Sequence, residues 1–321
     1  MIKNILIIFL VTLVIILYID STKMNEAEKS NNESSKSFSN DLNELEKIRS
    51  ISKKPSNNIK KIGWIPDWDF EDSFKEIKNS NIKYDTLSPV WFLLNENGSL
   101  KKNEFTNNSD FIKYTSKNKI ELIPTITQLD PLTLNEILKS EENYKRHVEA
   151  IIGQALDNDY DGIDLDYEAI YLKDKDKYFD LLEDLSKGLK LNDKKLVVTV
   201  LPKWGDEVIY KTLPETRAVQ DYNRINIFVD EIRIMAYEYT GRSAEAYGPI
   251  SPIDWIEDII RYSLLSGVPR EKLVIGVNTY SYNYTERPEM ESINYYPVYE
   301  PRSTKNLEDA LAHFLQTLKV Y

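Results

Sequence analysis

The chain has 321 residues, of which 41% are hydrophobic and 29% are charged, a balance typical of globular proteins. Its formal net charge of -11 argues against a nucleic-acid partner, because phosphate binding needs lysine and arginine in excess on one surface. There is no cysteine, and the two histidines are His147 and His313. Disulfides and cysteine nucleophiles are therefore excluded, and a multi-histidine metal site is nearly excluded. We expect the chemistry to rest on carboxylates and aromatic side chains.

Residues 1–20 are expected to be a signal sequence or an uncleaved signal-anchor. Lys3 precedes an apolar run from Ile5 to Ile19 that is interrupted only by Thr12. The run is shorter than the roughly 20 residues of a spanning helix, and no alanine-type cleavage site follows it, which favours retention as an anchor. Residues 21–59 are polar and indicate a linker. The protein would then be secreted, or tethered to the outer face of the plasma membrane by this segment alone.

From residue 60 onward, short apolar runs alternate with stretches of helical periodicity. A period of 3.6 residues is clear from Tyr178 to Leu189, and Pro252 and Gly267 mark the start and stop of another helix. Strands that alternate with helices imply parallel pairing through right-handed crossovers. Seven such units favour an α/β fold of the (β/α)8 TIM barrel type over an open doubly wound sheet. The expected strands are residues 61–65, 86–92, 121–127, 162–167, 196–201, 231–237 and 273–279.

The most informative segment runs from Asp161 to Glu168 and reads DGIDLDYE. Because side chains alternate along a strand, Asp164, Asp166 and Glu168 project to one face. Such a row inside a barrel is costly unless the carboxyls share protons or hydrogen bonds. Glu168 ends the strand at the carboxyl-terminal rim, where barrel enzymes carry their chemistry, and crowding raises the pKa values as a general acid requires. Two alternatives stay open, namely a solvent-facing strip on an edge strand and a site for Mg²⁺ or Ca²⁺.

This segment resembles the D-G-x-D-x-D-x-E motif of glycoside hydrolase family 18, the chitinase-like family, at every fixed position. The stretch from Met235 to Glu238 is similar to the sixth-strand motif M-x-Y-[DE] of that family. Other similar stretches follow in order over roughly residues 60–284. Chitinases usually carry aspartate where this chain has Glu238, and the glutamate looks more like the bacterial branch that cleaves peptidoglycan or spore-cortex glycans.

The resemblance implies hydrolysis of β-1,4 bonds in N-acetylglucosamine-containing polymers by a substrate-assisted, retaining mechanism, with no metal and no organic cofactor. Glu168 would protonate the leaving oxygen. Asp166 would stabilise the oxazolinium ion that the 2-acetamido group forms, and Asp164 would share a proton with Asp166. Tyr237 would hold the acetamido carbonyl in line for attack. Asp166 and Glu168 lie about 6.6 Å apart along a strand, so they can reach the leaving oxygen and the 2-substituent of one sugar.

Trp91, Glu238 and Trp68 are candidates for lining the sugar subsites, with ordinary packing as the alternative for Trp91 and an unliganded loop position for Trp68. The eighth strand of the family carries a floor tryptophan, but the last tryptophan here is Trp255. The barrel, assigned to residues 60–321, is therefore expected to be incomplete at its carboxyl-terminal end. A non-catalytic carbohydrate-binding protein and a truncated inactive member of the family stay open as alternatives. The partner is an N-acetylated glycan polymer, chitin or peptidoglycan, and the sequence indicates no oligomeric state.

Overall fold

The computed structural model describes residues 59–205, 215–241, 248–280, 282–283 and 298–299. From Lys60 onward the described residues belong to one compact unit. The expected signal segment and all but the last residue of the linker lie outside the described residues. No helix within the described ranges is both long and apolar enough to cross a membrane.

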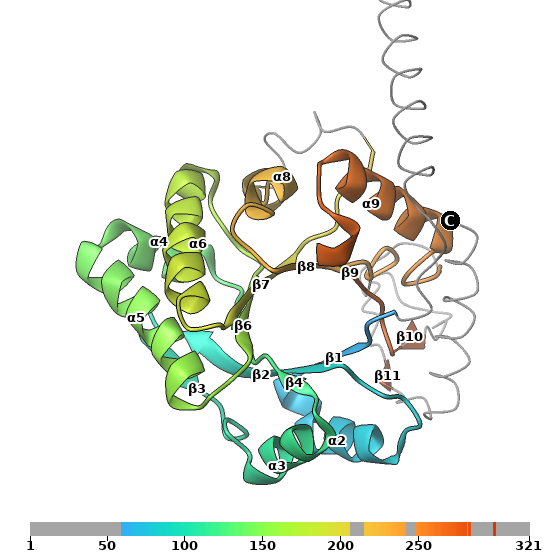
Figure 1. Cartoon of the computed structure of the whole chain (residues 1–321). Helices are drawn as coiled ribbons and strands as arrows, with labels where there is room; N and C mark the ends of the chain where they lie inside the picture. The colour runs from blue at the N-terminus through green and yellow to red at the C-terminus, as the bar shows by residue number, and fades with distance from the viewer. Residues whose placement is uncertain (1–58, 206–214, 242–247, 281, 284–297, 300–321) are drawn as a thin grey trace, which may run out of the picture. The chain divides into compact units, whose positions relative to one another are not determined.

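Seven strands form a curled parallel sheet: β1 (Ile62–Ile65), β2 (Thr86–Leu94), β5 (Thr125–Gln128), β6 (Gly162–Tyr167), β7 (Lys195–Val200), β8 (Glu231–Met235) and β9 (Leu273–Gly276). They are paired in the order β1-β2-β5-β6-β7-β8-β9, and each pair along this path is parallel. Figure 1 shows the sheet curling around a central space. β1 and β9 are its two ends, and no strand in the described part of the chain joins them. The fold is thus the expected (β/α) barrel without closure.

Four short strands complete the described sheet structure: β3 (Leu100–Lys102), β4 (Glu121–Leu122), β10 (Tyr282–Asn283) and β11 (Val298–Tyr299). β3 pairs antiparallel with β2, a hairpin that the sequence patterns do not predict. β4 and β5 together occupy the strand expected at residues 121–127. They are separated at Ile123 and Pro124, because a proline has no N–H to continue the ladder. β10 and β11 form a separate antiparallel pair.

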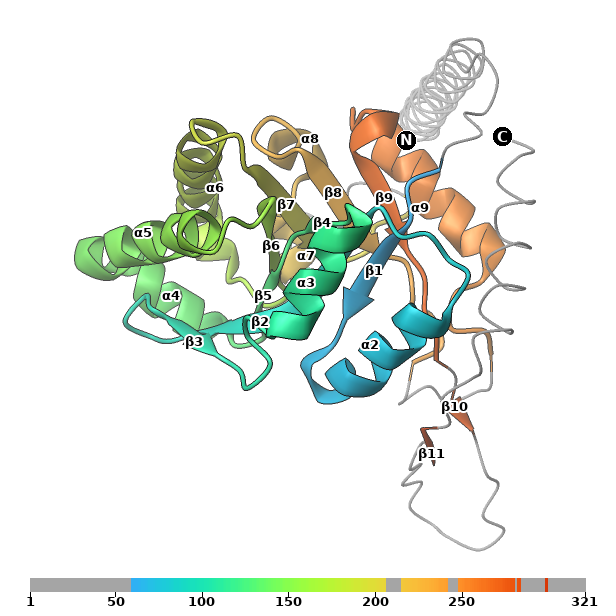
Figure 2. The same cartoon turned by 60° about the horizontal axis from the view of Figure 1, so that its bottom comes forward.

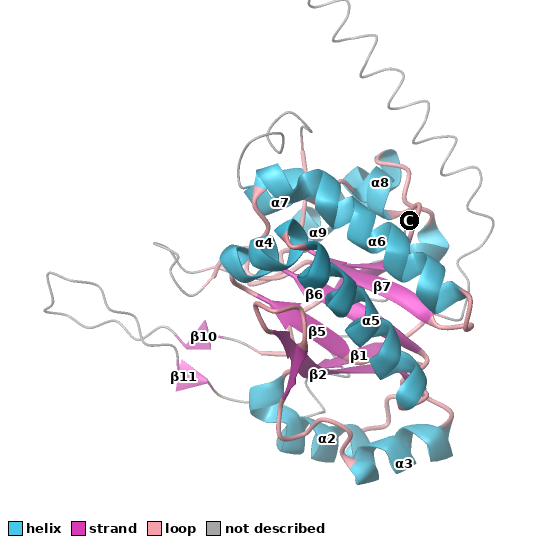
Figure 3. Ribbon diagram, turned by 90° about the vertical axis from the view of Figure 1, so that its left-hand side faces the viewer, coloured by secondary structure: helices cyan, strands magenta, loops and turns pink. Residues whose placement is uncertain are grey.

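Helices cover the outside of the sheet: α2 (Phe70–Asn79), α3 (Ser109–Asn118), α4 (Pro131–Lys139), α5 (Glu141–Asp157), α6 (Lys175–Lys190), α7 (Glu215–Val219), α8 (Tyr222–Ile225) and α9 (Ile253–Leu265). α6 and α9 confirm the two helices expected from periodicity and from the Pro252 and Gly267 signals. α2 and α3 lie side by side near β1 and β2 (Figure 2). α4, α5 and α6 form a layer over β5 to β7 (Figure 3).

The close approach of β6 to β7 explains the glycine of the carboxyl-rich motif. Gly162 is the register partner of Lys195, and a Cβ at Gly162 would lie 2.5 Å from the Lys195 carbonyl oxygen. Non-bonded carbon and oxygen atoms do not approach so closely, so any larger residue would push the two strands apart. Gly162 therefore sets the pairing that places the following carboxyls.

The outward face of β6 is anchored through a buried histidine on α5. His147 Nδ1 lies 3.1 Å from the carbonyl oxygen of Gly98, and Nε2 lies 2.8 Å from the Tyr167 hydroxyl. Because a carbonyl only accepts, Nδ1 carries the proton and Nε2 accepts from Tyr167. Burial lowers the pKa of His147 to about 4, so the ring is neutral at pH 7. His147 thus has a packing role and holds β6 in place from outside.

Candidate active site

The inner face of β6 carries the predicted row of carboxyls. Asp164 and Asp166 are fully buried, with 0% of each residue exposed. Glu168 follows the strand at the rim and is half-buried, and its backbone N–H donates to the Gln128 carbonyl at 2.9 Å. The apolar residues between them face the helices and are also buried. The alternation along the strand therefore brings the three carboxyls to one face, as the sequence predicts.

Asp164 has three donors around its carboxylate. The hydroxyls of Thr125 and Thr199, from the strands on either side, each donate at 2.9 Å. Arg233 Nη1 on β8 lies 3.4 Å from Oδ2. Burial raises the pKa of Asp164, and the arginine charge and the two hydroxyls oppose that rise. Asp164 is thus the carboxyl of the row whose ionised form is best supported.

Asp166 has far weaker support for a negative charge. Its Oδ2 lies 3.4 Å from the Thr127 hydroxyl, and its buried Oδ1 has no hydrogen-bond partner among the described residues. Burial raises the pKa of Asp166 well above its ordinary value, and the neighbouring charges of Glu168 and Asp164 raise it further. Burial also raises the pKa of Glu168. A carboxyl that keeps its proton toward neutral pH can act as a general acid.

Tyr237 and Glu238 follow β8 at the same rim. Burial raises the pKa of Tyr237, and the negative charges of Asp166 and Glu168 add to the rise, so the phenol keeps its proton. Tyr237 therefore lies close enough to the carboxyl row for the charge of the row to raise its pKa. Glu238 is exposed and has a φ of 64°, which is uncommon outside glycine. Its carboxylate accepts a hydrogen bond from the Tyr280 hydroxyl.

The two predicted tryptophans lie in different surroundings. Trp91 is fully buried, and its ring packs 5.8 Å from Phe111 and 5.9 Å from Tyr160, between the sheet and the helices. Phe111 lies on α3, outside the sheet, so Trp91 faces outward, at the point where the register of β2 and β5 shifts. The expectation that Trp91 lines a subsite is therefore wrong, and the packing alternative holds. Trp68 is 74% exposed just after β1, where the strand reaches the rim.

Several residues of the inner wall were not predicted from the sequence. Arg233, Thr125 and Thr199 contact Asp164. Trp64 on β1 is 37% exposed, and its Nε1–H donates to the Thr125 hydroxyl at 3.1 Å. Period-2 alternation places each of them on the inner face of its strand, which is the one signal that could have found them.

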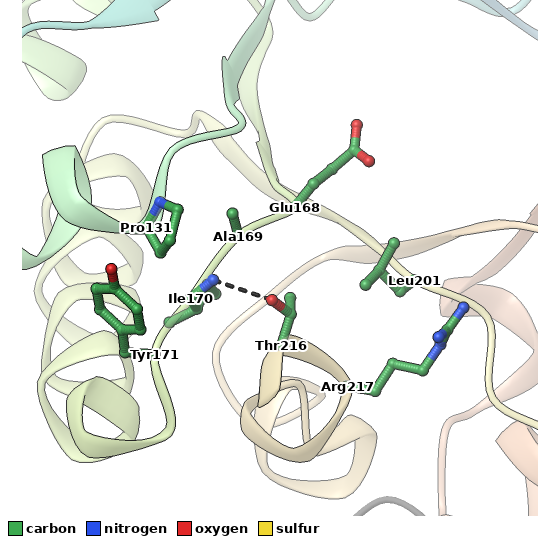
Figure 4. A pocket seen from close by; sticks show the side chains of 8 residues that line it. All are labelled: Pro131, Glu168, Ala169, Ile170, Tyr171, Leu201, Thr216 and Arg217. Carbon is green, nitrogen blue, oxygen red and sulfur yellow. Dashed lines mark hydrogen bonds between the residues drawn. The ribbon is translucent and has the colours of Figure 1, made fainter. Parts of the chain in front are cut away.

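A pocket of about 440 Å³ opens beside Glu168. Its walls come from the start of α4, the loop after β6, the end of β7 and α7. It is lined by Pro131, Glu168, Ala169, Ile170, Tyr171, Leu201, Thr216 and Arg217. The Ile170 N–H donates to the Thr216 hydroxyl at 3.0 Å, which ties α7 to the loop after β6 (Figure 4). In Figure 4 the Glu168 carboxyl points away from Ile170, so the acid stands at the edge of the pocket.

The arrangement of these groups suits proton transfer. Across the described ranges, no group of three or more histidine, aspartate or glutamate side chains is arranged to hold a metal ion. Burial raises the pKa values of all three carboxyls in the row, and of the three only Asp164 has a cation, Arg233, that opposes the rise. Neighbouring carboxyls in such different electrostatic surroundings are typical of acid–base sites.

Comparison with known proteins agrees with this geometry. The family model described as glycosyl hydrolases family 18 matches residues 90–317. The chain is 23% identical over 217 residues to an uncharacterized glycosylase, YvbX, of Bacillus subtilis, covering 64% of this chain and 60% of that protein. It is 27% identical over 214 residues to the cortical fragment-lytic enzyme of the same organism, covering 62% of this chain and 45% of that enzyme.

These matches are partial in length. The chain covers 60% of the length of the first of these relatives and 45% of the second. Among solved structures, the spore cortex-lytic enzyme SleL of Bacillus megaterium has a TM-score of 0.65 at 19% identity, over 80% of this chain and 58% of that one, which shows a shared fold. Because the family match extends over most of the sequence, the chain belongs to glycosyl hydrolases family 18.

Proposed function

We propose that this chain hydrolyses β-1,4 glycosidic bonds in N-acetylglucosamine-containing polysaccharide, with Glu168 as the general acid. The observation that carries the proposal is the carboxyl row, in which a protonatable Glu168 stands at the rim above a buried pair of aspartates. Membership of family 18 supports glycoside hydrolysis as the reaction class.

In the first step, the Glu168 carboxyl donates its proton to the glycosidic oxygen as the bond from that oxygen to the anomeric carbon breaks. The 2-acetamido carbonyl oxygen of the same sugar forms a bond to the anomeric carbon, giving an oxazolinium ion. Water then attacks this carbon, the ring opens back to the acetamide, and the Glu168 carboxylate takes the proton from the water. Two inversions leave the anomeric configuration retained.

Asp166 and Tyr237 act on the acetamido group in this scheme. The Asp166 carboxyl faces the N–H of the group and stabilises the positive charge that develops there. The Tyr237 phenol keeps its proton, because burial and the nearby carboxyls raise its pKa, so it can donate to the acetamido carbonyl oxygen. Asp164 takes up the proton that Asp166 gives up.

Trp68 and Glu238 are the exposed rim residues that we assign to contacts with flanking sugars, and we assign the pocket beside Glu168 to the leaving group. Both chitin and peptidoglycan carry the required 2-acetamido group. The glutamate at position 238 and the similarity to the cortical fragment-lytic enzyme favour a peptidoglycan-like chain. The apolar N-terminal run supports action outside the cytoplasm, with the protein secreted or tethered by that run.

One observation favours a second candidate, a non-catalytic carbohydrate-binding protein. No strand among the described residues closes the barrel between β9 and β1, and no tryptophan follows Trp255 in the sequence. A barrel open between β9 and β1 could hold a glycan at the rim without orienting the scissile bond. The retained Glu168 favours the enzyme over this candidate.

The test is turnover of a chromogenic N-acetylglucosamine oligomer by the full chain beside a Glu168→Gln variant. A matched control is Glu149→Gln, which alters an exposed glutamate on α5. We expect the first variant to lose turnover by roughly 100-fold or more and the control to keep it. Proton NMR of the first product should show the β-anomer. An inactive wild-type chain that still binds the oligomer would instead support the binding protein.

A further inference from the structure

Arg233 lies on the inner face of β8, beneath the carboxyl row, with its side chain 7% exposed. Its Nη1 donates to the Ser88 hydroxyl at 2.6 Å and lies 3.4 Å from Asp164 Oδ2. Its Nε and Nη2 donate to Glu231 Oε2 at 3.3 and 3.1 Å. Every nitrogen of the guanidinium therefore has a partner, and the partners come from three strands.

Arg233 is also part of a longer chain of ion pairs across the barrel. Glu231 accepts from Lys60 at 2.7 Å, Lys60 contacts Glu121 at 3.2 Å, and Glu121 accepts from Lys195 at 2.5 Å. We call this set the floor network. Its members, in order of contact, are Asp164, Arg233, Glu231, Lys60, Glu121 and Lys195.

The charges of the floor network balance in only one protonation state. It contains three cations and three acids, so it is neutral when all three acids, including Asp164, are ionised. Asp166 stands outside the network and contacts none of its cations in the described structure. A proton on Asp164 would leave the network with a net charge of +1, because Glu231 would then be shared between Arg233 and Lys60, and an excess charge is unfavourable beside a buried guanidinium.

We propose that Arg233 is a positioning residue for hydrolysis, which keeps Asp164 ionised so that the proton of the aspartate pair rests on Asp166. The inference rests on the proposed function and adds a residue to it. When the oxazolinium charge develops, the Asp166 proton passes to the Asp164 carboxylate, and Asp166 becomes the anion that faces the cation. Atoms and charge balance, because one proton moves between two carboxyls. An Asp164 that is already protonated could not take part.

The groups around Asp164 restrict where the removal of Arg233 can act. The titratable groups nearest to it are Asp166 and Glu168 on β6, Glu231 on β8 and, at the rim, Tyr237. The other titratable groups of the floor network are Lys60, Glu121 and Lys195, and Tyr178 lies on α6, outside the sheet. Glu231 keeps Lys60 as a partner when Arg233 is absent, whereas Asp164 contacts no other cation among the described residues. The loss therefore falls on Asp164.

The first test compares pH profiles of oligomer turnover for the full chain, Arg233→Met and Arg233→Lys. The acidic limb reports protonation of Asp164, and the basic limb reports ionisation of Glu168. Loss of a cation in contact shifts a carboxyl pKa upward by about 1–3 units, so the acidic limb of Arg233→Met should move to higher pH by at least about one unit. KM and the basic limb should change little, and Arg233→Lys should recover most of the shift. A uniform loss of turnover with both limbs in place would overturn the proposal.

The second test does not depend on activity. Infrared difference titration follows the carbonyl stretch of protonated carboxyls in the full chain. We expect Arg233→Met to gain one such signal at neutral pH, and Arg233→Met combined with Asp164→Asn to lose it. Lys195→Met, which removes the cation at the far end of the floor network, should gain none. If Arg233→Met gains no signal, the role of Arg233 is wrong. If the wild-type chain hydrolyses no oligomer but the signal appears, the proposed function fails while the assignment of the proton holds.

Discussion

The two ends of the barrel interior hold the same kind of side chain in opposite situations. At the floor, burial raises the pKa values of Glu121 and Glu231, but the hydrogen bonds and charges of their lysine and arginine partners outweigh it, so both values are lowered. At the rim, burial raises the pKa values of Asp166 and Glu168, and no cation contacts either carboxyl within the described part of the chain.

The contrast indicates that the carboxyls at the floor stabilise the fold, whereas those at the rim serve the reaction. Breaking a buried ion pair by removing one partner destabilises a protein, because it leaves the other charge uncompensated. An uncompensated buried carboxyl costs stability in every folded molecule but holds a proton ready for transfer. Barrel enzymes place their chemistry at the carboxyl-terminal rim, whereas Glu121 and Glu231 stand at the first residues of β4 and β8, at the opposite end of the strands. Changes at the two ends should therefore have opposite consequences.

The largest effect is expected from Asp166→Asn. The variant removes the carboxyl that faces the developing oxazolinium charge, so turnover should fall by roughly 100-fold or more. The same change removes a carboxyl whose ionised form burial and the charges of Glu168 and Asp164 disfavour, so the melting temperature should stay the same or rise. Turnover and a thermal melt on the same preparation check both. A variant that lost stability as well as turnover would place Asp166 among the structural carboxyls.

The carboxyls at the floor and at the rim should change the free energy of unfolding in different pH ranges. The floor glutamates have lowered pKa values, so their stabilisation is complete above the ordinary value of 4.5 and is lost as the pH falls through their folded values. The rim carboxyls have raised values, so stability declines as the pH rises from their ordinary values through their folded ones. Each unit of pKa difference corresponds to about 1.4 kcal/mol.

Urea unfolding at a series of pH values measures this dependence. We expect the wild-type chain to be most stable in the mildly acidic range. Asp166→Asn combined with Glu168→Gln should flatten the decline on the alkaline side and leave the acidic side unchanged. If the double variant altered only the acidic side, the rim carboxyls would have lowered pKa values, and the assignment of raised pKa values to them would be wrong.

A smaller effect is expected behind the row, on the outward face of β6. Tyr167→Phe leaves His147 Nε2 buried without its donor, which should cost about 1–3 kcal/mol in the free energy of unfolding. Turnover per folded molecule should be unchanged, because Tyr167 faces the helices. Tyr178→Phe is the matched control, since the Tyr178 hydroxyl has no hydrogen-bond partner among the described residues. Equal costs for the two variants would show that the His147 contact contributes nothing.

The smallest effect is expected at the exposed rim. Trp68→Ala should leave the free energy of unfolding within about 0.5 kcal/mol, because the ring is 74% exposed. If Trp68 stacks on a flanking sugar, KM for a long glycan should rise a few-fold, while a short chromogenic substrate is unaffected. Leu191→Ala, at an 86% exposed residue after α6, is the control. An unchanged KM for the long glycan would assign Trp68 to the unliganded loop alternative.

The sequence predicts the elements well because the relevant signals are local. The order of strands and helices, the seven-strand extent of the sheet and the row from Asp164 to Glu168 all follow from apolar runs and from the period of two along a strand. The residues that contact this row from other strands cannot be predicted from these local signals. Thr125 reaches Asp164 because the register of β5 and β6 places these two residues opposite each other, and register cannot be read from one strand alone.

Arg233 and Trp91 show the same limit. Arg233 lies 69 positions after Asp164, and only the curl of the sheet brings its guanidinium within 3.4 Å of that carboxylate. The resemblance to family 18 makes Trp91 a candidate for lining a sugar subsite. Its packing against Phe111 shows that it faces outward, at the point where the register of β2 and β5 shifts, and neither the contact nor the shift can be read from one strand.

The most direct test of the separation between floor and rim compares Glu168→Gln with Glu121→Gln in the full chain, by measuring turnover per folded molecule and the free energy of unfolding for both. The rim variant should lose turnover by roughly 100-fold or more and keep or gain stability. The floor variant should lose about 1–2 kcal/mol, because the Glu121 side chain is 32% exposed and its two ion pairs are partly screened, and should keep turnover within a few-fold. If both variants lost turnover and stability together, floor and rim would be one cooperative unit, and the separation of stability from chemistry along the barrel axis would be contradicted.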